Sequence, residues 1–307
     1  MDSVVKVADK EVKLTNLEKI YWPGEGYTKY DLIKYYTDIS PYLLKYLKGR
    51  PVNFQRFPDG IHGKRFYQKN CPDHAPPWIK TFPITSEGDK VTNYILVEDV
   101  PTLVWLANLG CLEIHPWLSS TASLHRPDYA VFDLDPPDFN FFPQVLEVAL
   151  LVKEALDSLG IKSYAKTSGS SGVQVFVPLE NKFSYEEVRI FSGTVCTVIE
   201  KFDRRTTTER RVAARGERIY LDYMQNVQGK TINAPYSVRP LKGAPVSTPL
   251  LWDEVEKGKV RPGDFTIKTI FKRLQEKGDV FTGHPGEKQD IGPFLEELKA
   301  ASAGAGP

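Results

Sequence analysis

The sequence predicts an α+β protein made of two packed modules. Between residues 129 and 223, a strand, a helix, two strands, a helix and a strand follow one another, which is the pattern of a small split βαβ sheet. The first 125 or so residues instead mix short strands with amphipathic helices. With 307 residues, 41% hydrophobic and 26% charged, the chain is large enough for both. We expect modules at about 1–125 and 126–275 within one domain, 1–299, followed by a flexible tail, 300–307.

Local signals predict the elements of the N-terminal module. Residues 4–14 alternate apolar and polar side chains, as one or two short strands do. Thr28 and Asp31 resemble a capping box that opens a helix. Ser40-Pro41 fits the N-cap and first residue of a second helix, which Gly49 would end. The remaining expected elements are a strand at 52–57, a basic and aromatic stretch at 64–69, and a helix at 101–110.

The second module begins with an apolar strand, 129–135, which Pro136-Pro137 stops because proline donates no hydrogen bond to a sheet. The helix that follows has apolar residues at helical spacing and ends at Gly160. The expected elements are the helix at about 143–159, strands at 161–165 and 173–179, a helix at 185–202, a basic loop at 203–218, a strand at 218–223, and helices at 264–277 and 290–299.

Composition limits the classes of function. The net charge is +1, so binding to a polyanion must rely on local basic patches rather than on an overall field. The three cysteines, Cys71, Cys111 and Cys196, indicate a reducing compartment without a disulfide framework. The sequence has neither a secretory signal nor an apolar run of membrane-spanning length. We therefore expect a cytoplasmic protein without a membrane partner.

Two carboxylates at the end of the apolar strand are the main chemical signal. Asp133 and Asp135 are two residues apart on a strand, so their side chains point to the same face. Two like charges side by side are costly unless a cation lies between them, and oxygen ligands suit Mg²⁺ or Mn²⁺. Asp222 lies on an apolar strand that can neighbour this one in a split βαβ sheet. Three carboxylates would hold two divalent ions about 3.5–4 Å apart. The alternatives are an acidic turn after a strand and an Asp222 that caps a turn or pairs with an arginine.

Three further patterns are weaker. The turn at 168–172 offers backbone N–H groups to phosphate, but glycine and serine are also common in plain hairpin turns. Cys71 with His74, and Cys111 with His115, spell a zinc pattern, although such cysteines often simply pack. Basic residues interleaved with aromatic ones suit single-stranded or gapped nucleic acid, and a solvated basic face is the alternative. The basic residues are Arg204, Arg205, Arg210, Arg211, Arg215 and Arg218, and also Lys64, Arg65 and Lys69 beside Phe66 and Tyr67.

Three stretches stand in the order of the three motifs of the archaeo-eukaryotic primase superfamily. They are Phe132-Asp133-Leu134-Asp135-Pro136, the turn from Lys166 to Val175, and Tyr220-Leu221-Asp222-Tyr223. Over roughly residues 10–275 the chain resembles the polymerase domain of bacterial end-joining DNA ligases. The resemblance implies an RRM-like catalytic sheet and an active-site cleft between the two modules. Supporting stretches lie at 56–60, 71–76, 234–239 and 243–249.

The resemblance also implies roles for individual residues. Asp133, Asp135 and Asp222 would bind two divalent ions, Mn²⁺ or Mg²⁺, with Asp222 nearest the ion that activates the primer 3′-hydroxyl. Lys19 and Lys29 would bind the 5′-phosphate of the DNA. The positions that match nucleotide-binding residues are His115, Ser168, Ser170, Gln174, Arg215, Gln225 and Arg239, and those that match template-stacking aromatics are Phe66 and Tyr67.

The implied function is template-dependent nucleotidyl transfer with NTPs or dNTPs, ribonucleotides being preferred, to fill short gaps at DNA double-strand breaks in non-homologous end joining. The implied partners are gapped or broken DNA, a separate ATP-dependent DNA ligase and a Ku-type protein, near the nucleoid of a prokaryote. A primase, a non-catalytic DNA-end-binding module and a two-metal nuclease are the alternatives. Two departures matter: Gln174 replaces the usual motif histidine, and no Lys-x-Asp-Gly ligase motif occurs, so we expect a stand-alone protein or an excised domain.

Overall fold

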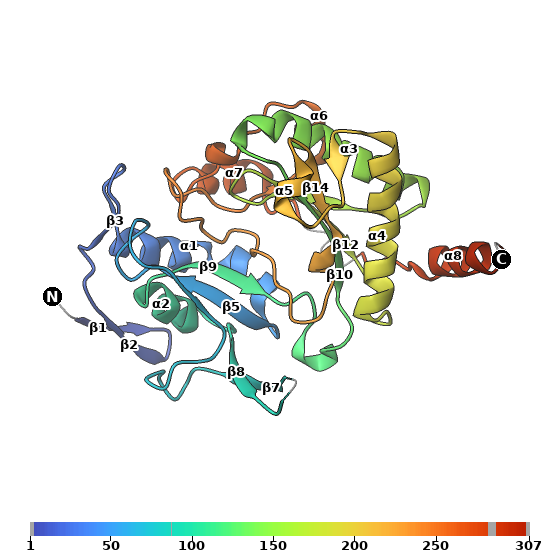
Figure 1. The fold of residues 1–307 in the computed structure, drawn as a ribbon. Coiled ribbons are helices and arrows are strands. Elements are labelled where there is room, and N and C mark those ends of the chain that lie inside the picture. The colour runs from blue at the N-terminus through green and yellow to red at the C-terminus, as the bar shows by residue number, and fades with distance from the viewer. Residues whose placement is uncertain (1–2, 87, 282–286, 305–307) are drawn as a thin grey trace. The chain divides into compact units, whose positions relative to one another are not determined.

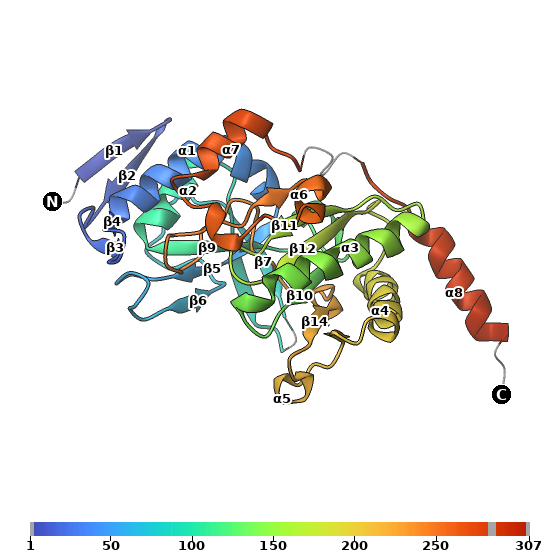
Figure 2. The same ribbon diagram turned by 90° about the horizontal axis from the view of Figure 1, so that it is seen from above.

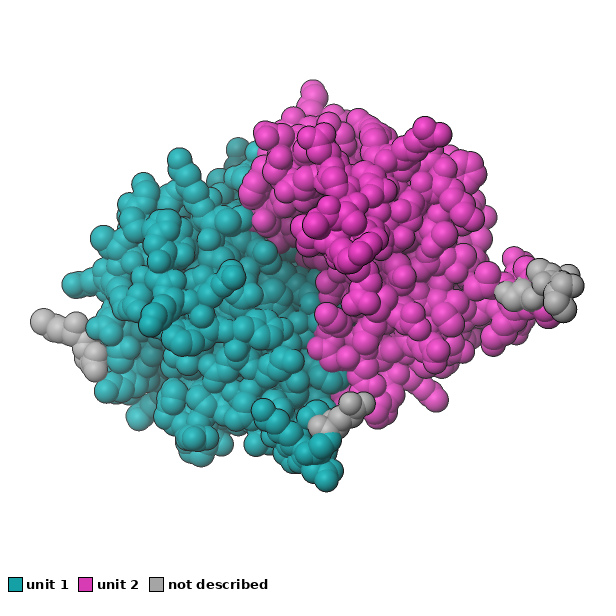
Figure 3. Space-filling model, viewed as in Figure 1, with its two compact units in different colours: residues 1–122, 231–248, 262–278 teal, residues 123–230, 249–261, 279–307 magenta. Residues whose placement is uncertain are grey.

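The computed structural model describes residues 3–86, 88–281 and 287–304, and has the mixed α and β composition that the sequence predicts. The chain forms two compact units, coloured separately in Figure 3. Unit 1 contains residues 1–122, 231–248 and 262–278, and unit 2 contains 123–230, 249–261 and 279–307. The units are therefore discontinuous in sequence, because two segments expected in the second module belong to unit 1.

Unit 1 is built on a five-stranded sheet with β5 at its centre. One edge of β5 pairs with β9, and the other pairs with β8 at its start and β6 at its end. Helices α1 and α2 pack against each other and against β9 (Figure 1). The elements of unit 1 are β1 (Ser3–Val7), β2 (Lys10–Leu14), β3 (Ile20–Trp22), β4 (Tyr27–Thr28), α1 (Lys29–Leu47), β5 (Pro51–Arg56), β6 (Phe66–Gln68), β7 (Thr81–Thr85), β8 (Val91–Leu96), α2 (Val100–Asn108), β9 (Cys111–Pro116), η4 (Pro262–Asp264) and α7 (Ile270–Lys277).

The predicted start of helix α1 is confirmed, and the predicted break in it is wrong. Thr28 and Asp31 form the capping box. The helix then runs through Pro41 to Leu47 instead of restarting at Ser40. Proline at 41 leaves the carbonyl of Thr37 without its usual donor, and the Ser40 hydroxyl donates to that carbonyl at 2.8 Å. The serine that looked like an N-cap thus repairs the gap in the helix.

Other differences have local causes. Strands β7, β8 and β9 were not predicted, and Cys111 begins a strand rather than ending a helix. The predicted helix at 264–277 is α-helical only from Ile270, because Thr266 and Thr269 bond each other's backbone and side-chain groups just before it. The last helix ends at Gly304 rather than at 299, so the segment expected as a tail is helical up to that residue, and residues 305–307 lie outside the described part.

Unit 2 holds a six-stranded sheet in the order β13-β14-β10-β12-β11-β15. Its four central strands are the fourth, first, third and second along the chain, with antiparallel neighbours, which is the predicted split βαβ arrangement. Helices α3 and α4 pack on β10 and on each other (Figure 2). The elements of unit 2 are β10 (Tyr129–Asp135), η2 (Phe139–Phe141), α3 (Phe142–Ser158), β11 (Tyr164–Thr167), β12 (Val173–Pro178), α4 (Tyr185–Phe202), β13 (Thr206–Thr207), α5 (Val212–Arg215), β14 (Ile219–Asp222), η3 (Tyr223–Gln225), β15 (Pro249–Leu250), α6 (Trp252–Glu256) and α8 (Gly292–Gly304).

The alternation of side chains along β10 decides which residues face the helices. Phe132 is fully buried, and its ring lies 6.2 Å from that of Phe191 on α4. Asp133 and Asp135 therefore point to the other face of the sheet. Beyond β14, the Asn226 side chain accepts from the N–H of Val131 at 2.8 Å and donates to its carbonyl at 2.7 Å. This side chain fixes the end of β14 against β10. Within the described residues, no helix is long and apolar enough to span a membrane.

Candidate active site

Four polar side chains form a row across four neighbouring strands of unit 2. Lys166 on β11 lies directly opposite Gln174 on β12, Gln174 lies opposite Asp133 on β10, and Asp133 lies opposite Asp222 on β14. Directly opposed residues of antiparallel strands place their side chains on the same face, with Cβ atoms about 4.5–5.5 Å apart. The sequence-based expectation that Asp222 neighbours the first two acids is therefore confirmed at the level of strand register.

Asp133 is the member of this row whose negative charge is least favoured by its surroundings. Its side chain is buried, and its Oδ1 atom has no hydrogen-bond partner. Burial, followed by the charges of Asp135 and Asp222, raises the pKa of Asp133 well above its usual range. A hydrogen bond from Gln174 and the charge of Lys166 oppose this rise. A buried carboxylate oxygen without a partner needs either a proton or a cation.

Asp222 is held by its own neighbours. Its Oδ1 accepts from the backbone N–H of Met224 at 2.9 Å and from the hydroxyl of Tyr220 at 3.2 Å. Its Oδ2 accepts from the side-chain amide of Gln225 at 3.0 Å. Burial and the Asp222 charge raise the pKa of Tyr220, which keeps this hydroxyl a donor. Asp222 thus caps η3, the turn-capping role that the sequence left open as an alternative.

A divalent cation can be tested against this donor set. Carboxylate oxygens are the ligands that Mg²⁺ and Mn²⁺ prefer, and the partnerless Oδ1 of Asp133 fits such an ion. Among residues 3–86, 88–281 and 287–304, however, no group of three or more His, Cys, Asp or Glu side chains is arranged to hold a metal. Both oxygens of Asp222 already accept hydrogen bonds, from Tyr220, Met224 and Gln225. The residues fit a metal through Asp133, and Asp222 would have to exchange partners to join it.

The turn between β11 and β12 packs on the end of β10, at Leu134 and Asp135. A Cβ atom placed on Gly172 would lie 2.6 Å from the carbonyl oxygen of Leu134 and 3.4 Å from Oδ1 of Asp135. The Ser168 hydroxyl accepts from the backbone N–H groups of Ser170 and Gly172, each at 3.1 Å. Two of the N–H groups that the sequence suggested for phosphate binding are therefore bonded within the turn. The turn is held by these bonds and lies against the end of β10.

Arg215 lies on the Tyr220 side of the site. Its guanidinium carbon is 3.6 Å from the centre of the Tyr220 ring, a cation–π contact. Its nitrogens also donate to the carbonyls of Glu209 and Arg210 at 2.9 Å. Together with the bond from Gln225 to Asp222, this places both expected nucleotide-aligning residues around Asp222. Whether they contact a nucleotide stays a prediction.

A second group of expected site residues lies in unit 1. Asn53 on β5 is directly opposite His115 on β9, and Glu113 lies two residues before His115 on the same face. The segment after Thr231 runs along β9, with the N–H of Ala234 donating to the carbonyl of Ile114, and brings Arg239 to Glu113. This face of the unit 1 sheet is polar, whereas Phe54 and Ile114 on the other face are buried apolar residues.

Glu113 is the buried anion of this group. Its Oε1 lies 3.0 Å from Nε of Arg239, and its Oε2 lies 3.6 Å from Nε2 of His115. Burial alone would raise the pKa of Glu113, but His115 and Arg239 outweigh it and lower that pKa. Three buried atoms here lack hydrogen-bond partners of good geometry: Oδ1 of Asn53, Nε2 of His115 and Nε of Arg239. Such a cluster of unsatisfied groups is what a polar ligand would complete.

The two lysines expected at a 5′-phosphate are neighbours in the backbone. The N–H of Lys29 donates to the carbonyl of Lys19 at 2.8 Å, and Lys29 is the first residue of α1. The side chains differ in availability. Lys29 is buried, with Nζ donating to the carbonyl of Thr15 at 2.6 Å, whereas Lys19 is partly exposed and forms an ion pair with Asp59. Lys19 is the more accessible of the two cations.

Phe66 and Tyr67 are both about half exposed on β6. Adjacent residues of a strand point to opposite faces, so the two rings cannot form one continuous platform. The Tyr67 hydroxyl accepts from Asn53 at 2.7 Å, and its ring lies 6.5 Å from that of His115. Tyr67 therefore lies with the polar face of unit 1, and Phe66 faces away from it.

Among the described residues, Cys71, His74, Cys111 and His115 do not belong to any group of three or more side chains that could hold a metal, so the zinc alternative gains no support. Cys111 is fully buried in β9, and burial raises the pKa of its thiol.

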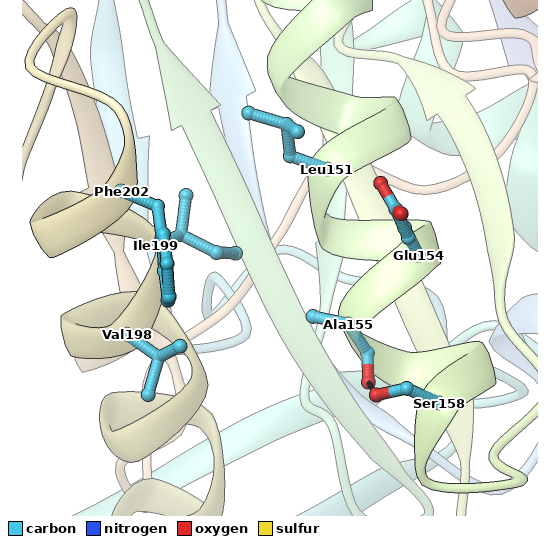
Figure 4. Close-up of a pocket in the computed structure, with 7 residues that line it drawn as sticks. All are labelled: Leu151, Glu154, Ala155, Ser158, Val198, Ile199 and Phe202. Carbon is cyan, nitrogen blue, oxygen red and sulfur yellow. Dashed lines mark hydrogen bonds between the residues drawn. The ribbon is translucent and has the colours of Figure 1, made fainter.

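A separate cavity of about 430 Å³ lies between α3 and α4 of unit 2 (Figure 4). None of the expected site residues lines it. Its lining residues are Leu151, Glu154, Ala155, Ser158, Val198, Ile199 and Phe202.

Sequence reasoning missed two buried ionised residues, Lys166 and Glu113. Glu113 and His115 have the period-two spacing of a strand, so the signal for Glu113 was present once 111–116 is read as strand β9. Lys166 carried no such signal, because a lysine in a short strand is usually exposed. In the folded sheet it lies directly opposite Gln174, to which its Nζ donates a hydrogen bond.

Comparisons with known proteins agree with this geometry. Residues 28–281 match the family model described as LigD, primase-polymerase domain. The chain is 38% identical over 303 residues to the bifunctional non-homologous end joining protein LigD of Bacillus subtilis, covering 97% of this chain and 48% of that protein. It is 30% identical over 274 residues to the multifunctional LigD of Mycolicibacterium smegmatis, covering 88% of this chain and 36% of that one. The chain thus spans half or less of these curated relatives.

A solved structure of a LigD polymerase domain is also similar to this chain. The polymerase domain of Mycobacterium tuberculosis ligase D, solved in complex with DNA, superposes with a TM-score of 0.83 at 27% identity, covering 91% of this chain and 99% of that one. The fold, the ordered carboxylates and the family model point to a nucleotidyltransferase, an enzyme class that uses nucleotides and divalent cations. The chain belongs to the LigD primase-polymerase domain family.

Proposed function

We propose that this protein extends primers by template-dependent nucleotidyl transfer and fills short gaps at broken DNA ends. The observation that carries the proposal is the direct opposition of Asp133 and Asp222, with Asp135 beside them, in a chain of the primase-polymerase family. The buried and partnerless Oδ1 of Asp133 supports a cation-dependent reaction at this point. The names of the relatives, which are non-homologous end joining proteins, support the place of the reaction in DNA repair.

The residues of unit 2 would hold the reacting groups. Bound divalent ions, Mn²⁺ or Mg²⁺, would lower the pKa of the primer hydroxyl and balance the charge that develops on the leaving pyrophosphate. Asp133 and Asp135 would bind them through carboxylate oxygens held on a rigid strand, and Asp222 would join after releasing Gln225. The primer hydroxyl attacks the α-phosphate, the new phosphodiester forms, and pyrophosphate leaves. Gln174 and Ser168 would position the nucleotide from the adjoining strand and turn.

The polar face of unit 1 would bind the charged parts of the substrates. His115 and Arg239 are suited to phosphate, because both carry nitrogens beside the Glu113 carboxylate whose hydrogen bonds are not made with good geometry. Asn53 offers a free acceptor oxygen beside them, which suits a sugar hydroxyl. Lys19, close to the positive end of helix α1, is suited to the 5′-phosphate of a gap. Tyr67 presents an exposed ring on which a base can stack.

The partners of the protein follow from this proposal. The substrate is gapped or broken DNA with a 5′-phosphate. A Ku-type protein would recruit the polymerase to the broken chromosome, and a separate ATP-dependent ligase would seal the filled gap. Ribonucleotides are the preferred substrates. The structural neighbour from Mycobacterium tuberculosis was solved with DNA, which supports DNA as the bound nucleic acid.

Extension of a gapped, 5′-phosphorylated duplex with Mn²⁺ and either ribo- or deoxynucleotides tests the proposal. Wild-type protein should extend the primer. Asp133→Ala and Asp135→Ala should each abolish extension while leaving DNA binding intact, because the carboxylates contact the reacting groups rather than the duplex. Retained extension in either variant would refute the metal role. A dinucleotide-synthesis assay without primer separates gap filling from priming, the second candidate.

A further inference from the structure

The row across the unit 2 sheet contains a buried cation that no part of the proposed reaction uses. The Lys166 side chain is completely inaccessible to solvent, and its strand neighbour Gln174 is also buried. A lysine is seldom buried unless its ammonium group is paired. Nζ of Lys166 donates to Oε1 of Gln174 and lies 5.7 Å from the centre of the Phe176 ring. The amide of Gln174 is therefore a principal partner of this charge.

The ammonium group fixes the orientation of the amide. Lysine has three donors and no acceptor, so only the oxygen of Gln174 can face it. The amide nitrogen must then face the opposite way, toward β10, where Asp133 lies directly opposite Gln174. The reverse orientation would place N–H groups against an ammonium group and an oxygen against a carboxylate. Without the lysine, only the Asp133 carboxylate would orient the amide, so the orientation would be held from one side instead of two.

The consequence falls on Asp133. Oδ1 of Asp133 is buried and lacks a hydrogen-bond partner, and Gln174 lies directly opposite this carboxylate on the neighbouring strand. The direction of the Asp133 carboxylate is thus set by a chain of contacts that begins two strands away. Residues that contact a metal ligand without touching the metal fix the direction of that ligand in many sites.

We propose that Lys166 is a positioning residue that acts through Gln174 to hold Asp133 with one oxygen directed at a divalent cation. The inference rests on the proposed function, because it assigns Lys166 a role in the same site. It also gives Gln174 a role toward the carboxylate, in addition to any contact with the nucleotide. A lysine that served only the core would stabilise the fold without affecting ion binding.

A double-mutant cycle on ion binding tests this. Lys166→Met, Gln174→Leu and the double variant are titrated with Mn²⁺ alone, without nucleotide or DNA, and free Mn²⁺ is followed by electron paramagnetic resonance. Each single change should weaken Mn²⁺ binding about 10-fold. The double variant should be no weaker than the worse single variant, because both changes break one chain of contacts.

Tyr164→Phe is the matched control. Tyr164 lies on the same strand and face as Lys166, and its hydroxyl contacts Glu287 rather than Gln174. Its Mn²⁺ affinity should equal that of the wild type. Thermal unfolding with EDTA verifies that each variant is folded. If Lys166→Met does not fold, Lys166→Gln takes its place, since a neutral amide keeps a donor but no longer fixes the orientation of Gln174.

The outcomes separate the two proposals. Unchanged Mn²⁺ affinity in folded Lys166 or Gln174 variants, or losses that simply add in the double variant, would overturn the positioning role while primer extension by the wild type still stands. Mn²⁺ binding by the wild type without primer extension would overturn the proposed function alone. Absence of Mn²⁺ binding by the wild type would overturn both.

Discussion

An alanine at Gly172 tests whether the turn between β11 and β12 sets the position of the carboxylates. The added Cβ would lie 2.6 Å from the carbonyl oxygen of Leu134, about 0.8 Å short of ordinary contact at 3.4 Å. Leu134 cannot yield easily, because its strand pairs with Val173 on one side and Leu221 on the other. Overpacking of this size costs about 1–3 kcal/mol of unfolding free energy.

The same displacement should also slow the nucleotidyl-transfer reaction. Asp133 and Asp135 flank Leu134, so a shift of its peptide by most of an ångström moves both carboxylates. A misplacement of about 1 Å can lower a rate about 100-fold. We therefore expect Gly172→Ala to lower the urea midpoint and to reduce primer extension about 100-fold on a gapped duplex with Mn²⁺.

Gly24→Ala is the control for this experiment. Its added Cβ meets no atom within 4 Å, and Gly24 has no positive φ, so stability should change by less than about 0.5 kcal/mol. Full stability and full extension in Gly172→Ala would refute the packing argument. Lost stability with unchanged extension would show that the turn supports the fold but not the carboxylates.

Three further predictions concern charge. Asp133→Asn should raise the melting temperature of the metal-free protein at pH 7 and remove its increase by Mn²⁺. Burial and the neighbouring acids raise the pKa of Asp133 above 3.8, so the folded wild type loses stability as pH rises from about 4 through that raised pKa. The gain in melting temperature from asparagine should therefore grow over this pH range, and a constant gain would contradict the reasoning. Asp59→Ala frees Lys19 and should tighten binding to a 5′-phosphorylated gap by about 2–5-fold in fluorescence anisotropy, with no change for the unphosphorylated gap. Glu113→Gln leaves Arg239 partly buried without its anion and should cost about 3 kcal/mol in urea unfolding, whereas a cost below about 1 kcal/mol would show that water already screens the pair.

The sequence predicted the site best where a backbone rule decides the outcome. Period-two spacing put Asp133 and Asp135 on one face, and the split βαβ pattern put Asp222 on the adjoining strand, as the register confirms. The direction of the Asp222 carboxylate could not be predicted, because it depends on hydrogen bonds from Gln225 and Tyr220 that a motif does not specify. Strand position is encoded locally, whereas side-chain direction depends on neighbours from distant parts of the chain.

The dependence of side-chain direction on distant neighbours also explains why the helix break at Ser40 was predicted wrongly and why the burial of Lys29 and Lys166 was not predicted. Ser40-Pro41 is a common helix start, but a serine hydroxyl can also replace the hydrogen bond that proline removes, and only the surrounding packing chooses between them. Lys29 begins a helix, as predicted, yet its side chain turns inward to Thr15. Lys166 is buried with its Nζ donating to Gln174, which lies on the strand next to β10. None of these choices follows from spacing alone.

The opposition of Asp133 and Asp222 also bears on how a misassembled molecule would behave. If β10 slipped by one residue, Asp133 would turn toward α4, into the apolar contact that Phe132 now makes with Phe191. An unpaired carboxylate in that contact would open the core of unit 2. Such a chain would be an early target for proteolysis rather than a polymerase with a faulty site. Errors in strand pairing are therefore expected to lower the amount of enzyme in the cell, and to leave the accuracy of the surviving molecules unchanged.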